Sequence, residues 1–167
     1  MIARNRIWEE LKQAKVNILC LQKYTDKRRA YNRYYNAFIA IVSSLGALGF
    51  SIDESIPFYT SLLVGFVSII KSILPNFLQS ETELSELDNL SDFYVQYMNS
   101  LERLWYNFDH NYVDEENTMK YFFDLKETEC SKQSKLNKGV RNISKKFQDE
   151  LNEGATKYIN RVYFVKE

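Results

Sequence analysis

The chain has 167 residues, of which 45% are hydrophobic and 15% aromatic, and this composition excludes a disordered chain. Only five Gly and two Pro are present, too few for many strands and tight turns, so we predict an all-α fold. The 22 basic and 22 acidic residues cancel, yet bases gather in residues 1–33 and 131–167 and acids in residues 81–130. Such blocks of opposite charge favour electrostatic packing between helices. The basic blocks could also bind nucleic acid, but the sequence has no aromatic-basic motif, so we expect no nucleic acid as a partner.

An amphipathic helix is predicted near the N-terminus, over residues 6–25. Its apolar side chains recur every three or four residues, at Ile7, Leu11, Ala14, Ile18 and Leu21. A cluster of cations and tyrosines follows directly. Cations attract lipid phosphates and tyrosine suits the boundary between water and hydrocarbon, so this cluster is typical of the cytoplasmic face of a membrane. We assign to that membrane interface the residues Lys27, Arg28, Arg29, Arg33, Tyr34 and Tyr35.

Two apolar stretches then lie back to back, in residues 34–52 and 56–78. At about 1.5 Å per residue each is long enough to cross a hydrocarbon core about 30 Å thick, so we predict a two-helix transmembrane hairpin. The bend between them holds Asp53 and Glu54 and no base, opposite in sign to the N-terminal flank. By the positive-inside rule both termini are then cytoplasmic and the bend faces outward.

Small and hydroxyl-bearing side chains recur within the hairpin, where close packing and serine hydrogen bonds drive helix association in lipid. Lys71, late in the second stretch, has two interpretations: its ammonium reaches back to the inner interface, or it lines a water-filled path in an oligomer. The pore lining that we predict consists of Ser43, Ser44, Gly65, Ser68, Lys71 and Ser72.

The remainder, residues 79–167, is predicted to form cytoplasmic helices. Leu, Tyr and Phe recur every three or four residues over 78–108, which predicts one long helix that continues from the second apolar stretch as a rod. A break is expected at Asp109-His110-Asn111. A second helix is expected to open at Asp114, because acidic side chains suit a helix N-terminus.

The last part of the chain carries weaker signals. Gly139 and Gly154 are each expected to mark the end of a helix. The tail, residues 158–165, alternates loosely between apolar and polar side chains. This pattern fits either a strand or a docked helix end.

The residues that catalysis would need are missing from the sequence. His110 is the only histidine and is expected to be exposed in a loop. Cys20 and Cys130 are expected to be ordinary small apolar residues, because disulfides rarely persist in the cytosol. The chain has no Gly-rich phosphate loop and no nucleophile elbow. We therefore expect no catalytic residue, cofactor or metal ion, and a protein that is not an enzyme.

The layout as a whole resembles the SLATT family, bacterial two-transmembrane effector domains associated with nucleotide-second-messenger and related antiphage systems. The likeness is carried by LQKYTDKRRAYNRYYNAFIAIVSSLGALGF (21–50), PFYTSLLVGFVSIIKSILPNF (57–77) and ETELSELDNLSDFY (81–94). It implies a single domain over residues 1–167, with a basic cytoplasmic helix in residues 1–33. It also implies a homo-oligomeric pore in the bacterial inner membrane that arrests or kills an infected cell, with a regulatory partner protein or a nucleotide signal as trigger.

Three functional interpretations follow. The first is a pore-forming effector in the lipid bilayer during antiphage defence. The second is a membrane-anchored helical scaffold or adaptor that binds a partner protein without forming a pore. In the third the chain is soluble, and the two apolar stretches are a buried hairpin at the centre of a helical bundle.

Overall fold

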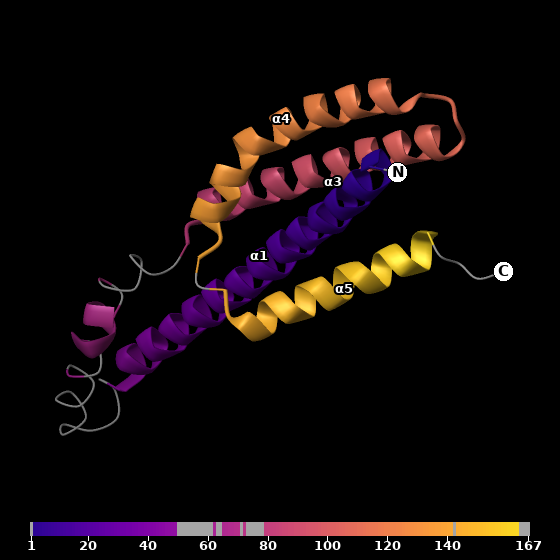
Figure 1. Cartoon of the computed structure of the whole chain (residues 1–167). Helices are drawn as coiled ribbons and strands as arrows, with labels where there is room; N and C mark the ends of the chain where they lie inside the picture. The colour runs from indigo at the N-terminus through magenta and orange to yellow at the C-terminus, as the bar shows by residue number, and fades with distance from the viewer. Residues whose placement is uncertain are drawn as a thin grey trace. The chain divides into compact units, whose positions relative to one another are not determined.

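The computed structural model describes residues 2–49, 62, 65–70, 72, 79–141 and 143–163 (Figure 1). Every regular element within these residues is helical, which confirms the all-α class. The labelled helices are α1 (Ile2–Gly49), α3 (Glu81–Asp109), α4 (Glu115–Gly139) and α5 (Lys145–Tyr163). Within the described residues, no helix combines the length and the apolar character that crossing a membrane requires.

Two compact units are formed, and they are described separately. The first, which we call the bundle, consists of Met1–Tyr24 and Ser85–Glu167. The other, which we call the second unit, is Thr25–Leu84. The bundle therefore combines the first half of α1 with nearly all of α3 and with α4 and α5.

The bundle has up-down-up-down topology, in which each helix runs antiparallel to the next. The backbone N–H of Ala3 at the start of α1 donates to Glu115 Oε1 at the start of α4, at 3.2 Å, so these two helices run parallel. Trp8 near the start of α1 packs on Trp105 near the end of α3, with ring centroids 5.3 Å apart. It also meets Tyr163 at the end of α5, at 5.6 Å, so α3 and α5 both run antiparallel to α1.

The core of the bundle follows the three-and-four spacing of the sequence. The stripe predicted for the N-terminal helix is confirmed, because its members are almost fully buried: Ile7, Leu11, Ala14, Ile18 and Leu21. Tyr94 and Leu101 on α3 and Leu151 and Ile159 on α5 complete the core with side chains that are also nearly inaccessible to water. Each fully buried side chain of this size contributes about 1.5–3 kcal/mol relative to leaving it exposed.

The amphipathic helix and the first apolar stretch form one helix, since α1 continues without interruption to Gly49. The last residues of the first stretch lie outside the described part of the chain. The second stretch is described at residues 62, 65–70 and 72, all of them helical.

The predicted rod, in which the second apolar stretch runs on into α3, is wrong. Gln79 and Ser80 are not helical, and α3 begins at Glu81. The backbone N–H of Glu83 donates to Ser80 Oγ at 3.2 Å, and the backbone N–H of Ser80 donates to Glu83 Oε2 at 2.9 Å. These reciprocal bonds form a capping box, which satisfies two backbone donors at the N-terminus of α3.

The break after α3 and the start of α4 are confirmed. Asn111 adopts φ 58°, a left-handed conformation that asparagine tolerates in turns. Asp114 caps α4, because its Oδ1 accepts a 2.8 Å hydrogen bond from the backbone N–H of Asn117. His110 is exposed, as expected, and its Nδ1 lies 2.9 Å from the carbonyl oxygen of Tyr106.

The two glycines of the C-terminal part differ. Gly139 is the last residue of α4, as predicted. It allows a close approach, since a Cβ built there would lie 2.5 Å from Cδ2 of the buried Leu87. The prediction that Gly154 ends a helix is wrong, because α5 runs through it to Tyr163. The tail is thus a docked helix end as far as it is described.

Candidate functional site

The six predicted membrane-interface residues all lie on α1, within the second unit: Lys27, Arg28, Arg29, Arg33, Tyr34 and Tyr35. Tyr34 is 77% exposed, the largest exposed fraction among the outward-facing apolar side chains of the described residues. Arg29 Nε lies 3.8 Å from Glu81 Oε2, an ion pair at the start of α3. The buried hydroxyl of Tyr35 has no hydrogen-bond partner within the described residues. Contact with a membrane surface stays a prediction for these six.

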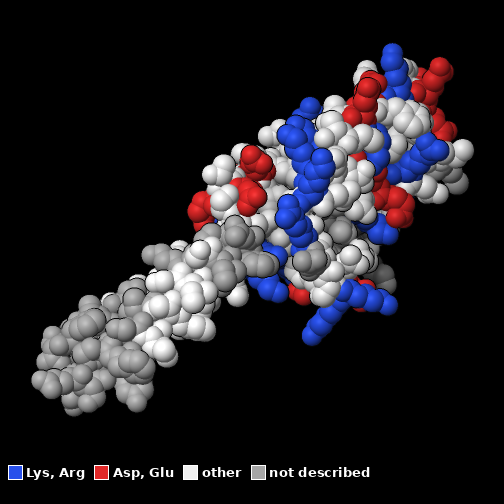
Figure 2. Space-filling model, turned by 90° about the vertical axis from the view of Figure 1, so that its left-hand side faces the viewer, with Lys and Arg blue, Asp and Glu red and all other residues white. Residues whose placement is uncertain are grey.

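Large apolar side chains face outward on the second unit. Phe38 and Ile41 on α1 are 51% and 61% exposed, and Leu62, Phe66 and Ile69 are all at least 59% exposed. The described part of the predicted hairpin contains no Asp, Glu, Lys or Arg. In Figure 2, charged side chains gather over the bundle, whereas a stretch of described surface in the same view bears neither sign. Large contiguous apolar surface is typical of regions that contact lipid or another protein.

The predicted pore-lining residues are described only in part. Ser44 is exposed, and its hydroxyl donates to the carbonyl oxygen of Ala40 at 2.8 Å. Exposed positions are also found at Gly65, Ser68 and Ser72. The side chain of Ser43 and the whole of Lys71 lie outside the described residues. A shared pore lining stays a prediction.

A network of ionised and phenolic side chains lies inside the bundle, between α1, α3 and α4. Lys126 Nζ donates to Glu10 Oε1 at 2.8 Å and to Glu129 Oε2 at 3.2 Å. The Tyr94 hydroxyl donates to Glu129 Oε1 at 2.9 Å, and the Tyr97 hydroxyl donates to Glu10 Oε1 at 3.1 Å. We call these five residues the buried network. Two carboxylates thus share one ammonium and are each supported by one phenol.

Burial and charge perturb the titration of this network. Burial, together with the hydrogen bond to Glu129 and nearby carboxylates, raises the pKa of Tyr94 well above its ordinary value. Burial and the charge of Glu10 raise the pKa of Tyr97 in the same way. For Lys126, burial opposes the charged form, but hydrogen bonds to both carboxylates prevail and raise its pKa. The phenols therefore stay neutral donors and the lysine stays charged at neutral pH.

The sequence did not predict this network, because its five residues come from three separate parts of the chain. A signal was present. Glu129 lies seven residues after Phe122 and seven before Leu136, and all three are buried on α4. A charged residue at a core position of a heptad needs an internal partner, and Lys126 lies three residues away.

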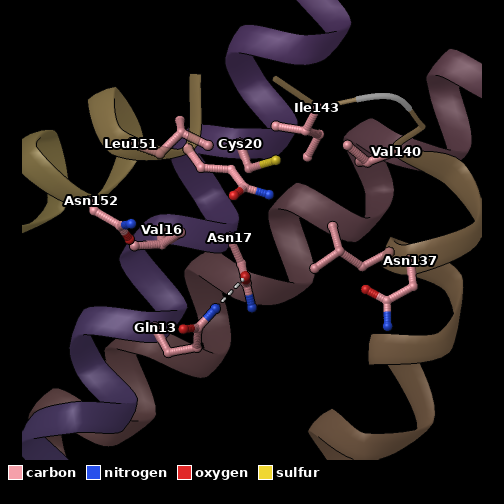
Figure 3. A pocket seen from close by; sticks show the side chains of 11 residues that line it. Gln13, Val16, Asn17, Cys20, Asn137, Val140, Ile143, Leu151 and Asn152 are labelled. Carbon is pink, nitrogen blue, oxygen red and sulfur yellow. Dashed lines mark hydrogen bonds between the residues drawn. The ribbon is translucent and has the colours of Figure 1, made fainter. Parts of the chain in front are cut away.

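The bundle also contains a cavity of about 330 Å³, between α1, α4, α5 and the segment that connects the last two helices (Figure 3). Five carboxamide side chains line it: Gln13, Asn17, Asn137, Gln148 and Asn152. Figure 3 shows Gln13 joined to Asn17 by a hydrogen bond, in which Gln13 Nε2 donates to Asn17 Oδ1 at 3.0 Å. Sequence reasoning could not find this cavity, because its residues come from both ends of the chain.

Both cysteines are free thiols, Cys20 buried at the cavity and Cys130 exposed. Within the described residues, His, Cys, Asp and Glu nowhere gather in a group that could hold a metal ion.

The fold and these features define an all-α protein with an up-down-up-down helical bundle and a second, outwardly apolar unit. Comparison with family models, curated proteins and solved structures gave no match to this chain.

Proposed function

We propose that the chain is a membrane-inserted effector whose assembled form permeabilises the bilayer. Residues 34–52 and 56–78 enter the membrane as a hairpin, and the bundle stays in water. In this proposal the pore forms in the inner membrane of a bacterial cell during antiphage defence, as the resemblance to the SLATT family implies. Both termini are then cytoplasmic.

The observation that supports insertion is the outward-facing apolar surface of the second unit. Phe38, Ile41, Leu62, Phe66 and Ile69 are all more than half exposed. A fully buried side chain of this size is worth about 1.5–3 kcal/mol relative to exposure in water. Hydrocarbon supplies that burial. The described residues of the hairpin include no Asp, Glu, Lys or Arg, so they avoid the penalty of placing ions in lipid, and Lys71 is the one charged residue of the two stretches.

The flanking cations support the orientation. Lys27 and Arg33 are exposed on α1, about two turns before the first apolar stretch and directly before it, respectively. A juxtamembrane cation gains about 1 kcal/mol near an anionic cytoplasmic leaflet. Tyr34, also exposed, begins the apolar stretch and suits the interface.

Membrane fractionation of the full chain, expressed in bacterial cells and washed with alkaline carbonate, tests insertion. We expect the wild-type chain to stay in the pellet. An Ile41→Asp variant should be released, because an acidic side chain at the centre of a membrane helix costs about 2.5–3.5 kcal/mol. Tyr112→Asp, which places the same charge at a position 68% exposed on the bundle, is the matched control and should stay in the pellet. Release of the wild-type chain would rule out insertion and support the soluble helical bundle.

Permeabilisation is tested separately, with a membrane-potential dye in cells and ion leakage from vesicles. Under the pore proposal the wild-type chain depolarises cells and leaks ions. Lys71→Leu should reduce the leak if Lys71 lines the path. Unchanged leakage in that variant would remove Lys71 from the proposed lining.

The second candidate is a membrane-anchored adaptor. It is favoured by the division of the chain into two compact units, since the bundle has a core and a cavity separate from the apolar surface. A chain that stays in the carbonate-washed pellet but never depolarises cells would support the adaptor. Deletion of residues 34–78 should then leave binding of its partner protein intact.

A further inference from the structure

The cavity of the bundle has the size of a small-molecule site and an uncharged lining. Its volume of about 330 Å³ lies at the lower end of the range of about 300–1,000 Å³ found for ligand pockets. Among the described residues that line it there is no Asp, Glu, Lys, Arg or His. The thiol of Cys20 also faces this cavity, and burial raises its pKa, so it is neutral as well. The described lining therefore offers a charged ligand no opposite charge to replace the water that it displaces.

The lining is rich in groups that pair with the edge of a polar ring. Each carboxamide presents two N–H donors beside a carbonyl acceptor, and such groups bind bidentately to rings that carry a donor next to an acceptor. Gln148 and Asn152 lie one turn apart on α5, and Asn137 lies near the end of α4. The amides of these three side chains make no hydrogen bond to another described residue. They are available to a ligand.

Asn17 differs from these three residues, because its side chain already accepts a hydrogen bond from within the protein. It is 6% exposed, and its Oδ1 accepts a hydrogen bond from Gln13 at 3.0 Å. It therefore fixes the floor of the cavity and holds Gln13 in place. The polar groups left for a ligand are those on α4 and α5.

Aliphatic side chains form the remaining walls. Val16 comes from α1 and Leu151 from α5. Val140 and Ile143 come from the end of α4 and the connecting segment. Figure 3 shows these four side chains among the carboxamides. Branched aliphatic groups pack well against the faces of a flat ring, while the amides bond its edge.

We propose that this cavity binds a flat, uncharged heterocycle whose edge carries a hydrogen-bond donor beside an acceptor. Free nucleobases and ring carboxamides share this chemistry. The site lies within the bundle, so it does not depend on insertion of the apolar stretches, and its failure would leave the proposed function untouched.

Ligand-observed saturation-transfer NMR on the purified full chain, in detergent where needed, tests the proposal with adenine and nicotinamide as separate probes. We expect at least one to bind, and the one that binds identifies the source of the ring. Nicotinate, which replaces the amide of nicotinamide by a carboxylate, should bind at least about tenfold more weakly than nicotinamide. Absence of binding by both adenine and nicotinamide would overturn the proposal, as would equal binding of nicotinate.

Variants on the exposed face of α5 connect binding to the cavity. Gln148→Leu combined with Asn152→Leu should weaken binding of the probe about thirtyfold, because the two substitutions each remove one hydrogen bond worth about 1 kcal/mol. Both positions are exposed, so the fold should persist, which circular dichroism will check. Asn160→Leu, exposed on the same helix and outside the cavity lining, should bind as the wild type does. Unchanged binding in the double variant would place the probe elsewhere and overturn the proposal.

Cys20 offers an independent readout at the cavity. In a Cys130→Ser background, which removes the exposed thiol, Cys20 is the remaining target for a maleimide. A probe in the cavity should slow its alkylation. An unchanged alkylation rate at saturating probe would contradict binding at this cavity.

Discussion

Removal of the ammonium at the centre of the buried network is the sharpest test of how the bundle is held together. Lys126→Met keeps the length of the side chain and deletes its charge. Two carboxylates then lose their shared cation, and Glu129 is 1% exposed. The carboxylate of Glu10 is little better solvated, with 12% of its side chain exposed.

The structure sets the size of the effect. Breaking a buried ion pair by removing one partner costs about 3–5 kcal/mol. Because the side chain of Lys126 is 33% exposed, water reaches part of the site, and we place the loss at the lower end, about 3 kcal/mol. For a chain of this length, 1 kcal/mol lowers the melting temperature by about 2–4 °C, so the expected decrease is about 6–12 °C.

Thermal unfolding of the full chain at pH 7, followed by circular dichroism at the helix band, measures this decrease. Addition of Glu129→Gln to Lys126→Met should recover about half of the loss, because the most deeply buried charge is then gone. Lys120→Met, at an exposed position on the same helix, is the matched control and should change little. A decrease under about 2 °C for Lys126→Met would refute the view that the network is tightly desolvated.

Three further outcomes are expected. The free energy of unfolding should fall as the pH rises above about 10, because the pKa values of Tyr94 and Tyr97 are raised in the folded state. The stability that these phenols contribute is complete below the pKa of tyrosine in the unfolded chain and is lost as the pH rises towards their pKa values in the folded chain. Thermal unfolding from about pH 8 to 11 measures this loss. Gly139→Ala should destabilise the chain by about 1–2 kcal/mol, measured by the shift in melting temperature, because the new Cβ meets Leu87 at 2.5 Å. Asp114→Ala should cost about 1 kcal/mol in the same assay, since it removes the N-cap of α4.

Each outcome has a control. Tyr112→Phe removes an exposed phenol and should leave the alkaline transition unchanged, whereas Tyr97→Phe should make it shallower. Gly154→Ala should lie close to the wild type, because a Cβ there meets only the end of Leu19, at 3.3 Å, and alanine favours the helix. Equal effects of the two glycine substitutions would contradict the assigned close approach at Gly139. An unchanged melting temperature for Asp114→Ala would contradict its capping role.

The elements that sequence alone could predict are those that depend on local signals. The stripe from Ile7 to Leu21 was predicted because a helix places every third or fourth residue on one face. Asp114 was predicted as a helix start because negative charge is favourable at the N-terminus of a helix. Neither inference needs to know which helix lies opposite.

Predictions failed where two signals competed or where partners were far apart in the sequence. At Ser80 the apolar periodicity suggested continuation, while the Ser-Glu-Thr-Glu motif favoured a new start, and the capping bonds prevailed. Gly154 was taken as an end, but packing on both sides of it keeps α5 helical, since tertiary contacts override a weak local preference. The cavity joins Gln13 to Gln148, and no local pattern reports a contact over that separation.

The buried network also selects one arrangement of the bundle from several that aliphatic packing would accept. Leucine and isoleucine contacts change little when a helix slides by one turn, about 5.4 Å, since another apolar residue takes the vacated place. Glu129 does not tolerate such a shift. If α4 moved by one turn, the carboxylate of Glu129 would lose its 2.9 Å hydrogen bond from the hydroxyl of Tyr94, and its charge would lie in an apolar core. Lys126, which is also on α4, donates to Glu10 on α1 at 2.8 Å, so the same register is fixed against a second helix. We therefore expect the five polar residues of the buried network to favour this register of the helices over shifted ones.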